Sequence, residues 1–143
     1  MLKKLNNQLD FYIIFIFVFL SGLILPVILI PVIKLTGYSE IIEEITKAVV
    51  IFFVVLKLSD RRMRVIGALA FGFLFGLSES FFYLSNIIQS GDFSVFWQRF
   101  LSAVPMHMIT VLVILLPSLF RKKYIIIGLG ISIFLHLLFN SFL

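Results

Sequence analysis

The sequence predicts an all-α membrane protein, a polytopic bundle of about five transmembrane helices. Hydrophobic residues make up 62% of the 143 residues and charged residues only 13%, and the mean hydropathy is +1.18. Several apolar runs approach or exceed the ~20 residues that a helix needs to cross ~30 Å of hydrocarbon. Soluble domains carry about twice this share of charge. We therefore expect residues 1–143 to form a single transmembrane domain.

The apolar runs place the predicted spans at about residues 11–35, 40–58, 65–88, 94–120 and 124–142. The first run is too long for a signal-peptide core and no small-residue cleavage site follows it, so we interpret it as a retained helix. Pro26 and Pro31 predict a bend in it. The second run begins with Glu40, Glu43 and Glu44, and carboxylates are favourable at a helix N-terminus.

The other three spans carry small residues at intervals of four. In the third span these are Ala68, Gly72, Gly76 and Ser80. Such a stripe lets membrane helices approach one another closely, so it predicts a face that contacts protein and not lipid. The fourth span carries Ala103 four residues before His107, with Pro105 loosening the turn between them, and the fifth carries Gly128 and Ser132.

Basic residues predict the orientation of the bundle. The clusters fall on alternate connections and are Lys3 and Lys4, then Lys57, Arg61, Arg62 and Arg64, then Arg121, Lys122 and Lys123. By the positive-inside rule the N-terminus is cytoplasmic and, with five spans, the C-terminus lies outside. We expect an integral protein of a cell membrane, of prokaryotic origin given its richness in Ile, Phe, Lys and Asn.

The composition also excludes some classes of function. The formal charge of +5 is confined to short segments between apolar runs, which is the pattern of topology signals facing anionic lipid and does not indicate a nucleic-acid-binding surface. The chain contains no cysteine, which rules out disulfides, thiolate metal ligands and a cysteine nucleophile. The partner that composition predicts is the lipid bilayer.

Five ionisable residues inside the spans are the candidate functional residues. They are Glu43, Glu44, Glu79, His107 and His136. A charged group near the bilayer centre costs on the order of 3 kcal/mol on insertion scales, so such residues usually mark a function. Structural interpretations exist for each of them: the glutamate pair suits a helix N-terminus, with Glu43 paired to Lys47, and a protonated Glu79 or a lone histidine can serve in helix packing.

Depth indicates that these five side chains can meet, and we expect them to line one cavity. At ~1.5 Å per residue, all five lie in the outer half of the bundle, within about 20 Å of its outer boundary. Glu79, His107 and His136 would offer one oxygen and two nitrogens, a ligand set suited to zinc with an open position for water. Glu43 or Glu44 would then be the base for that water, and Asn140 would orient His136 or stabilise an oxyanion. Lys47 and Arg99 are expected to support the site near the outer surface.

The motifs Glu43-Glu44-x-x-Lys47, Phe75-x-x-x-Glu79, Arg99 with His107, and His136-x-x-x-Asn140 resemble the four ordered motifs of the PrsW family of intramembrane proteases. That family is distantly related to CAAX-type and bacteriocin-processing membrane proteases. The resemblance implies a helical membrane metalloprotease whose site comprises the paired glutamates, the third-span glutamate and the two histidines. It implies hydrolysis of a peptide bond in a membrane-anchored protein or peptide by a glutamate-activated water, held by zinc or used without a metal. Ser80 departs from the asparagine that often follows the second-motif glutamate.

Two other functional classes stay open at this point. A haem-binding or proton-coupled membrane protein could use His107 and His136. A non-catalytic binding or immunity protein could retain the same scaffold.

Overall fold

A computed structural model describes residues 2–90 and 93–142, without the side chains of residues 2–10, 83, 85–87, 89, 90, 95 and 99. It consists of five long helices and one short 3₁₀ turn. The helices are α1 (Leu2–Thr36), α2 (Ser39–Lys57), α3 (Arg61–Ser90), α4 (Phe93–Ser118) and α5 (Ile125–Ser141), with η1 (Lys122–Tyr124) leading into α5. This confirms the predicted all-α fold.

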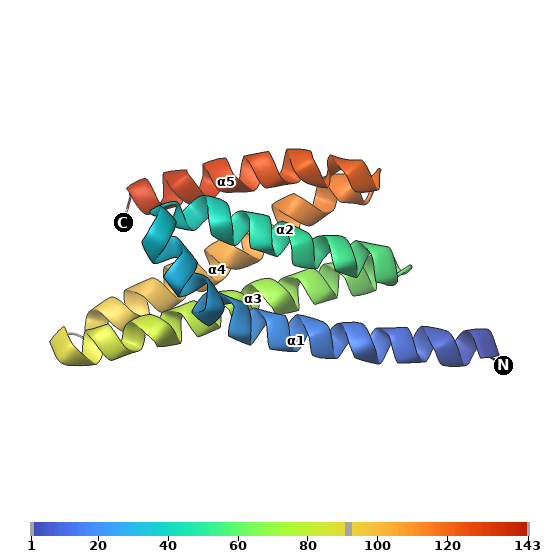
Figure 1. The fold of residues 1–143 in the computed structure, drawn as a ribbon, viewed down its shortest axis with the longest axis horizontal. Helices are drawn as coiled ribbons and strands as arrows, with labels where there is room; N and C mark the ends of the chain where they lie inside the picture. The colour runs from blue at the N-terminus through green and yellow to red at the C-terminus, as the bar shows by residue number, and fades with distance from the viewer. Residues whose placement is uncertain (1, 91–92, 143) are drawn as a thin grey trace.

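The helix ends follow from local sequence signals. Gly37, with a φ of 75°, ends α1 and donates its N–H to the Ile33 carbonyl at 2.8 Å, the arrangement that favours glycine after a helix. The carboxylate of Asp60 accepts from the backbone N–H groups of Arg62 and Met63 and so caps α3. Both signals keep the connections short, which places successive helices side by side (Figure 1).

Four of the helices contain segments long and apolar enough to cross a membrane. These are Phe11–Thr36, Arg61–Phe82, Phe96–Ser118 and Lys122–Ser141. The helix α2 carries more charge, but Glu43, Glu44 and Lys47 are buried inside the bundle. Ile45 and Val49 are exposed on its outward face, so that face is apolar and can also contact the hydrocarbon of a bilayer.

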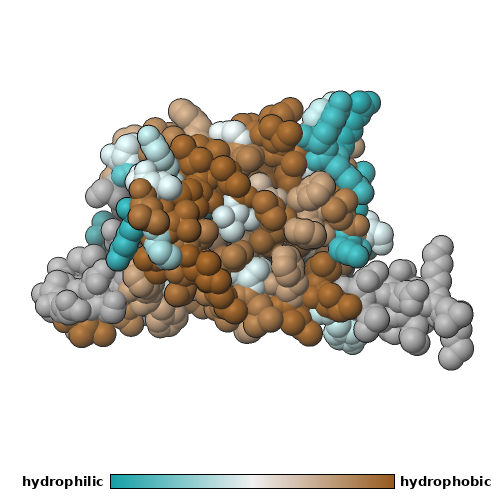
Figure 2. All heavy atoms as spheres, viewed as in Figure 1, coloured by the Kyte–Doolittle hydropathy of each residue, from teal (hydrophilic) through white to brown (hydrophobic). Residues whose placement is uncertain are grey.

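The surface of the bundle is apolar, as a bilayer requires and water does not. Figure 2 shows a broad hydrophobic band with hydrophilic residues gathered toward its ends. The N-terminus, the α2–α3 connection and the α4–α5 connection lie at one end, while the α1–α2 turn and the C-terminus lie at the other (Figure 1). The described basic clusters, at residues 57–64 and 121–123, therefore share one end of the molecule.

Close approach between α3 and α4 confirms the predicted protein-facing stripe. A Cβ atom built on Gly76 would lie 2.9 Å from His107 Cδ2, and one on Gly72 would lie 2.8 Å from the His107 carbonyl oxygen. Gly128 brings α5 equally close to α4, since its Cβ would lie 2.7 Å from the Cα atom of Ile114. These contacts set the separation between the helices that carry the candidate site residues.

The helix α1 packs mainly against α3. Ser78 donates a hydrogen bond to the Leu23 carbonyl at 2.7 Å, and the Cβ atom of Leu74 would lie 2.7 Å from a Cβ on Gly22. Figure 1 shows α1 changing direction along its length, in keeping with Pro26 and Pro31 inside it. The second half of α1 thereby crosses the bundle and reaches the candidate site.

Candidate functional site

The candidate site is a buried polar network to which four helices contribute. Lys47 of α2 lies at its centre with no exposed surface. Its Nζ atom donates to Glu44 Oε1 at 2.6 Å and lies 2.7 Å from His107 Nδ1 and 3.4 Å from Thr110 Oγ1. The ammonium also lies 4.9 Å from the centre of the Phe75 ring, within cation–π range.

The two histidines bind different glutamates. His107 Nε2 lies 2.5 Å from Glu79 Oε2, and His136 Nδ1 donates to Glu44 Oε1 at 2.8 Å. An ammonium at Lys47 has only donors, so His107 Nδ1 is the acceptor there and Nε2 carries the hydrogen donated to Glu79. The two imidazole rings are nearly perpendicular, with centroids 5.6 Å apart.

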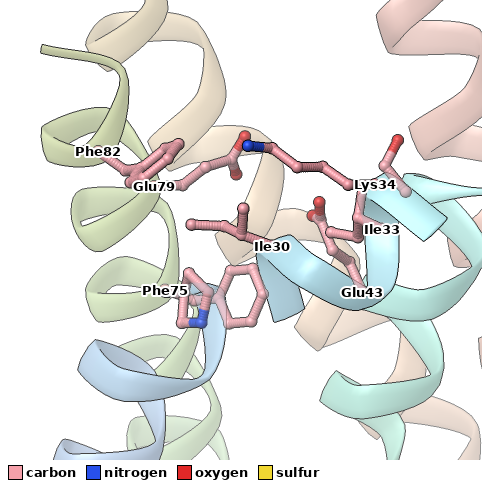
Figure 3. A pocket seen from close by; sticks show the side chains of 9 residues that line it. Ile30, Ile33, Lys34, Glu43, Phe75, Glu79 and Phe82 are labelled. Carbon is pink, nitrogen blue, oxygen red and sulfur yellow. The ribbon is translucent and has the colours of Figure 1, made fainter. Parts of the chain in front are cut away.

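The neighbouring residues Glu43 and Glu44 have different environments. Glu44 is fully buried, and its Oε1 atom holds both Lys47 and His136. Glu43 faces a pocket of about 330 Å³ between α1, α2 and α3 (Figure 3). Among the described residues, no hydrogen-bond partner reaches Oε2 of either glutamate. Lys47 therefore holds the carboxylate of Glu44, while the carboxylate of Glu43 points into the pocket. The structural interpretation of the sequence pairs Lys47 with Glu43 instead.

A second cluster lies at the base of this pocket. One ligand atom each from Glu43, Glu79 and His107 lie within 4.8 Å of one another. Two carboxylates at this separation repel unless a cation or a shared proton lies between them. Ligands of one zinc ion at ~2 Å are separated by at most ~4 Å, so this cluster is close to the spread that an ion requires. The unpartnered Oε2 atom of buried Glu43 also fits a site for a cation.

The remaining predicted site residues lie elsewhere. His136 adjoins the cluster through its contact with the His107 ring but is not one of the three grouped residues. Asn140 is exposed and donates to Glu40 Oε1 at 2.8 Å, which ties the end of α5 to the start of α2. We expected Lys47 near the outer surface, but it is fully buried at the centre of the bundle. The Arg99 side chain lies outside the part of the chain that the structure describes.

Only two of the five ionisable candidates line the pocket itself. Glu43 and Glu79 do, while Glu44, His107 and His136 lie behind them in the buried network. The expectation that all five line one cavity is corrected to this extent. The reason is that α1 closes the pocket on the side opposite α4 and α5, which periodicity within single helices does not reveal.

Sequence reasoning missed two groups of residues. Thr110 follows His107 by three positions, on the same helical face, and that spacing was a usable signal. The α1 residues that line the pocket gave no such signal, because three of them are apolar and resemble lipid-facing residues, while the fourth is a lysine at the helix end, where topology signals are common. They are Pro26, Ile30, Ile33 and Lys34.

Comparisons with known proteins add the family. No curated protein and no solved structure matches the chain. Residues 28–143 match the family described as PrsW family intramembrane metalloprotease. The match covers all four helices of the network and residues 28–36 of α1, and it includes every described residue of the candidate site except Pro26. The chain therefore belongs to the PrsW family of intramembrane proteases.

Proposed function

We propose that this protein hydrolyses a peptide bond of a membrane-anchored protein or peptide at the cluster formed by Glu43, Glu79 and His107. The observation that carries the proposal is this cluster, in which three potential ligand atoms from three helices lie within 4.8 Å of one another beside a pocket. Membership in an intramembrane protease family supports the reaction class.

Glu43, Glu79 and His107 are the residues that would hold a metal ion. Two carboxylates and one imidazole form a donor set that zinc accepts, and three protein ligands are typical of catalytic zinc. To bind the ion, His107 Nε2 would release the hydrogen that it donates to Glu79 in the metal-free protein, and the proton between Lys47 Nζ and His107 Nδ1 would keep the ring neutral. When bound, the ion would acidify a water molecule and polarise the scissile carbonyl. One oxygen of Glu43 is enough for a ligand, so its other oxygen remains available to accept a proton from the attacking water.

The buried network behind the cluster orients these groups. His107 is held at both ring nitrogens, by Lys47 and by Glu79, and its ring packs against Phe75 with centroids 5.2 Å apart. Glu44 offsets the charge of Lys47 and fixes His136. In this proposal Glu44 and Lys47 position the reacting groups, whereas Glu43 takes part in the chemistry.

Metal analysis beside a cleavage assay tests the proposal. Purified wild-type protein is expected to hold about one zinc ion and to cleave a membrane-anchored reporter, while Glu79→Gln and His107→Ala are expected to lose both. Gly130→Ala on α5 serves as the control, because no heavy atom lies within 4 Å of its added Cβ and it belongs to neither the cluster nor the network. Full cleavage by Glu79→Gln would overturn the proposed site.

A second mechanism at the same site follows from the closeness of the carboxylates. Glu43 and Glu79 could share one proton and activate water without a metal, as paired carboxylates do in aspartic proteases. Cleavage that survives complete removal of metal by a chelator, yet is lost in Glu43→Gln, would select this mechanism over the metal-dependent one.

A further inference from the structure

The pocket beside the cluster combines apolar walls with one positive charge. Ile30 and Ile33 of α1 and Phe75 of α3 form apolar sides, and the carboxylates of Glu43 and Glu79 lie on the other walls. Its volume of about 330 Å³ is at the lower end for ligand pockets, so it suits a short peptide segment and not a whole helix.

Lys34 is the cation among the residues that line this pocket. It is exposed on the last turn of α1, yet Figure 3 shows its side chain extending across the pocket toward Glu79. A lysine that only anchors a helix end would extend away from the bundle to the lipid headgroups. The observed direction places the ammonium on the Glu79 side of the pocket (Figure 3).

We propose that the pocket selects substrates in which an apolar side chain is followed by a carboxylate, and that Lys34 binds this carboxylate. The apolar residue would contact Ile30 and Ile33, and the carboxylate would lie at the mouth beside Lys34. This inference rests on the proposed function and names the substrate class of the same site. Lys34 is a specificity-determining residue in it and takes no part in bond cleavage.

The ion of the proposed site would offset the two negative charges of Glu43 and Glu79, and the charge of Lys34 would then favour an acidic partner. In the absence of this ion, Glu43 and Glu79 make the pocket negative, so an acidic peptide would be repelled from it without a cation at the mouth. Lys34 can supply a charge-assisted hydrogen bond to a carboxylate there, worth about a tenfold gain in affinity.

Binding of short peptides tests this inference apart from cleavage. Four probes in detergent solution share an N-acetyl leucyl-phenylalanyl unit and end in aspartyl amide, asparaginyl amide, lysyl amide or asparagine with a free carboxylate. Isothermal titration gives the Kd of each for wild type. We expect the aspartyl probe to bind about tenfold more tightly than the asparaginyl amide.

Variants connect that preference to Lys34. Lys34→Met should abolish the preference for the aspartyl probe over the asparaginyl amide. Lys34→Glu should reverse the charge preference in favour of the lysyl probe. Lys57→Met is the matched control, since Lys57 is an exposed lysine at the far end of α2, and it should keep the wild-type preference. Ile30→Trp should weaken all four probes alike by filling the pocket. A gain shown only by the free-carboxylate probe would support the inference and place the carboxylate at a chain end.

Two results would overturn the inference. One is equal binding of the four probes to wild type, which would mean that Lys34 only offsets the charge of Glu79. The other is loss of the preference when phosphatidylglycerol is added to the micelles, which would assign Lys34 to lipid phosphate. Selective binding without cleavage of any membrane-anchored substrate would leave this inference standing and remove the proposed protease activity.

Discussion

At the scale of single residues, the adjacent glutamates Glu43 and Glu44 differ in their surroundings and in the roles we expect of them. Glu43 faces the pocket with an unpartnered oxygen, while Glu44 is fully buried and bound to Lys47 and His136. Glu43→Gln should therefore abolish cleavage without loss of stability, because it relieves repulsion with Glu79 in the metal-free protein. Glu44→Gln should instead destabilise the fold by about 3 kcal/mol, because it leaves the Lys47 ammonium buried without its carboxylate. Thermal unfolding in detergent, beside the cleavage assay, measures both effects.

A double variant provides the control for this assignment. If the cost of Glu44→Gln arises from the buried charge, then adding Lys47→Met should recover part of it, because the two side chains are in direct contact. Strictly additive losses would contradict the pairing. Equal destabilisation by Glu43→Gln and Glu44→Gln would contradict the different roles of the two glutamates.

The sequence could name Glu43, Glu79 and His107 among its candidates but not which of the two adjacent glutamates faces the pocket. Adjacent residues on a helix differ by about 100°, so both Glu43 and Glu44 fit an inward-facing stripe. The choice depends on where α1 crosses α2 and α3, and residues 11–33 of α1 include few polar residues to indicate this. The grouping of Glu43, and not His136, with Glu79 and His107 depends on the same tertiary arrangement.

At the scale of helices, the small-residue stripe of α3 fixes the distance between Glu79 and His107. Gly76→Ala should push α3 away from α4, because its Cβ would lie 2.9 Å from both His107 Cδ2 and Val104 Cα. Overpacking of this kind costs typically ~1–3 kcal/mol, and we expect loss of stability together with loss of bound metal. Gly130→Ala is the matched control on α5, since no heavy atom lies within 4 Å of its added Cβ. Retention of wild-type stability and metal in Gly76→Ala would show that the close approach is not required.

Helix positions were predictable because the signals that set them are local. The predicted span at about 40–58 corresponds to α2 (Ser39–Lys57), and that at about 124–142 to α5 (Ile125–Ser141). The predicted span at about 65–88 is shorter than α3, which begins at Arg61 beyond the apolar run because Asp60 caps it there. Hydropathy finds the part of a helix that lies in lipid, whereas hydrogen bonding continues the helix past that part.

At the scale of the whole molecule, the arrangement of charge predicts how the bundle lies in the membrane. The basic connections at residues 57–64 and 121–123 share one end with the N-terminus, and the pocket opens toward the other end, near the α1–α2 turn. The positive-inside rule places the basic end in the cytoplasm, and hence the proposed active site in the outer half of the membrane. This orientation would expose the pocket to substrates anchored at the outer face.

Single cysteines can test this orientation directly, because the chain contains no cysteine of its own. Tyr38→Cys places a thiol at an exposed position in the α1–α2 turn, and Ser59→Cys places one in the exposed α2–α3 connection. A membrane-impermeant maleimide should label Tyr38→Cys in intact cells and should label Ser59→Cys only after the membrane is permeabilised. Because the two positions lie at opposite ends of α2, each variant is the control for the other. Labelling of Ser59→Cys from outside intact cells would invert the bundle and move the pocket, with Glu43 and Glu79, to the cytoplasmic half.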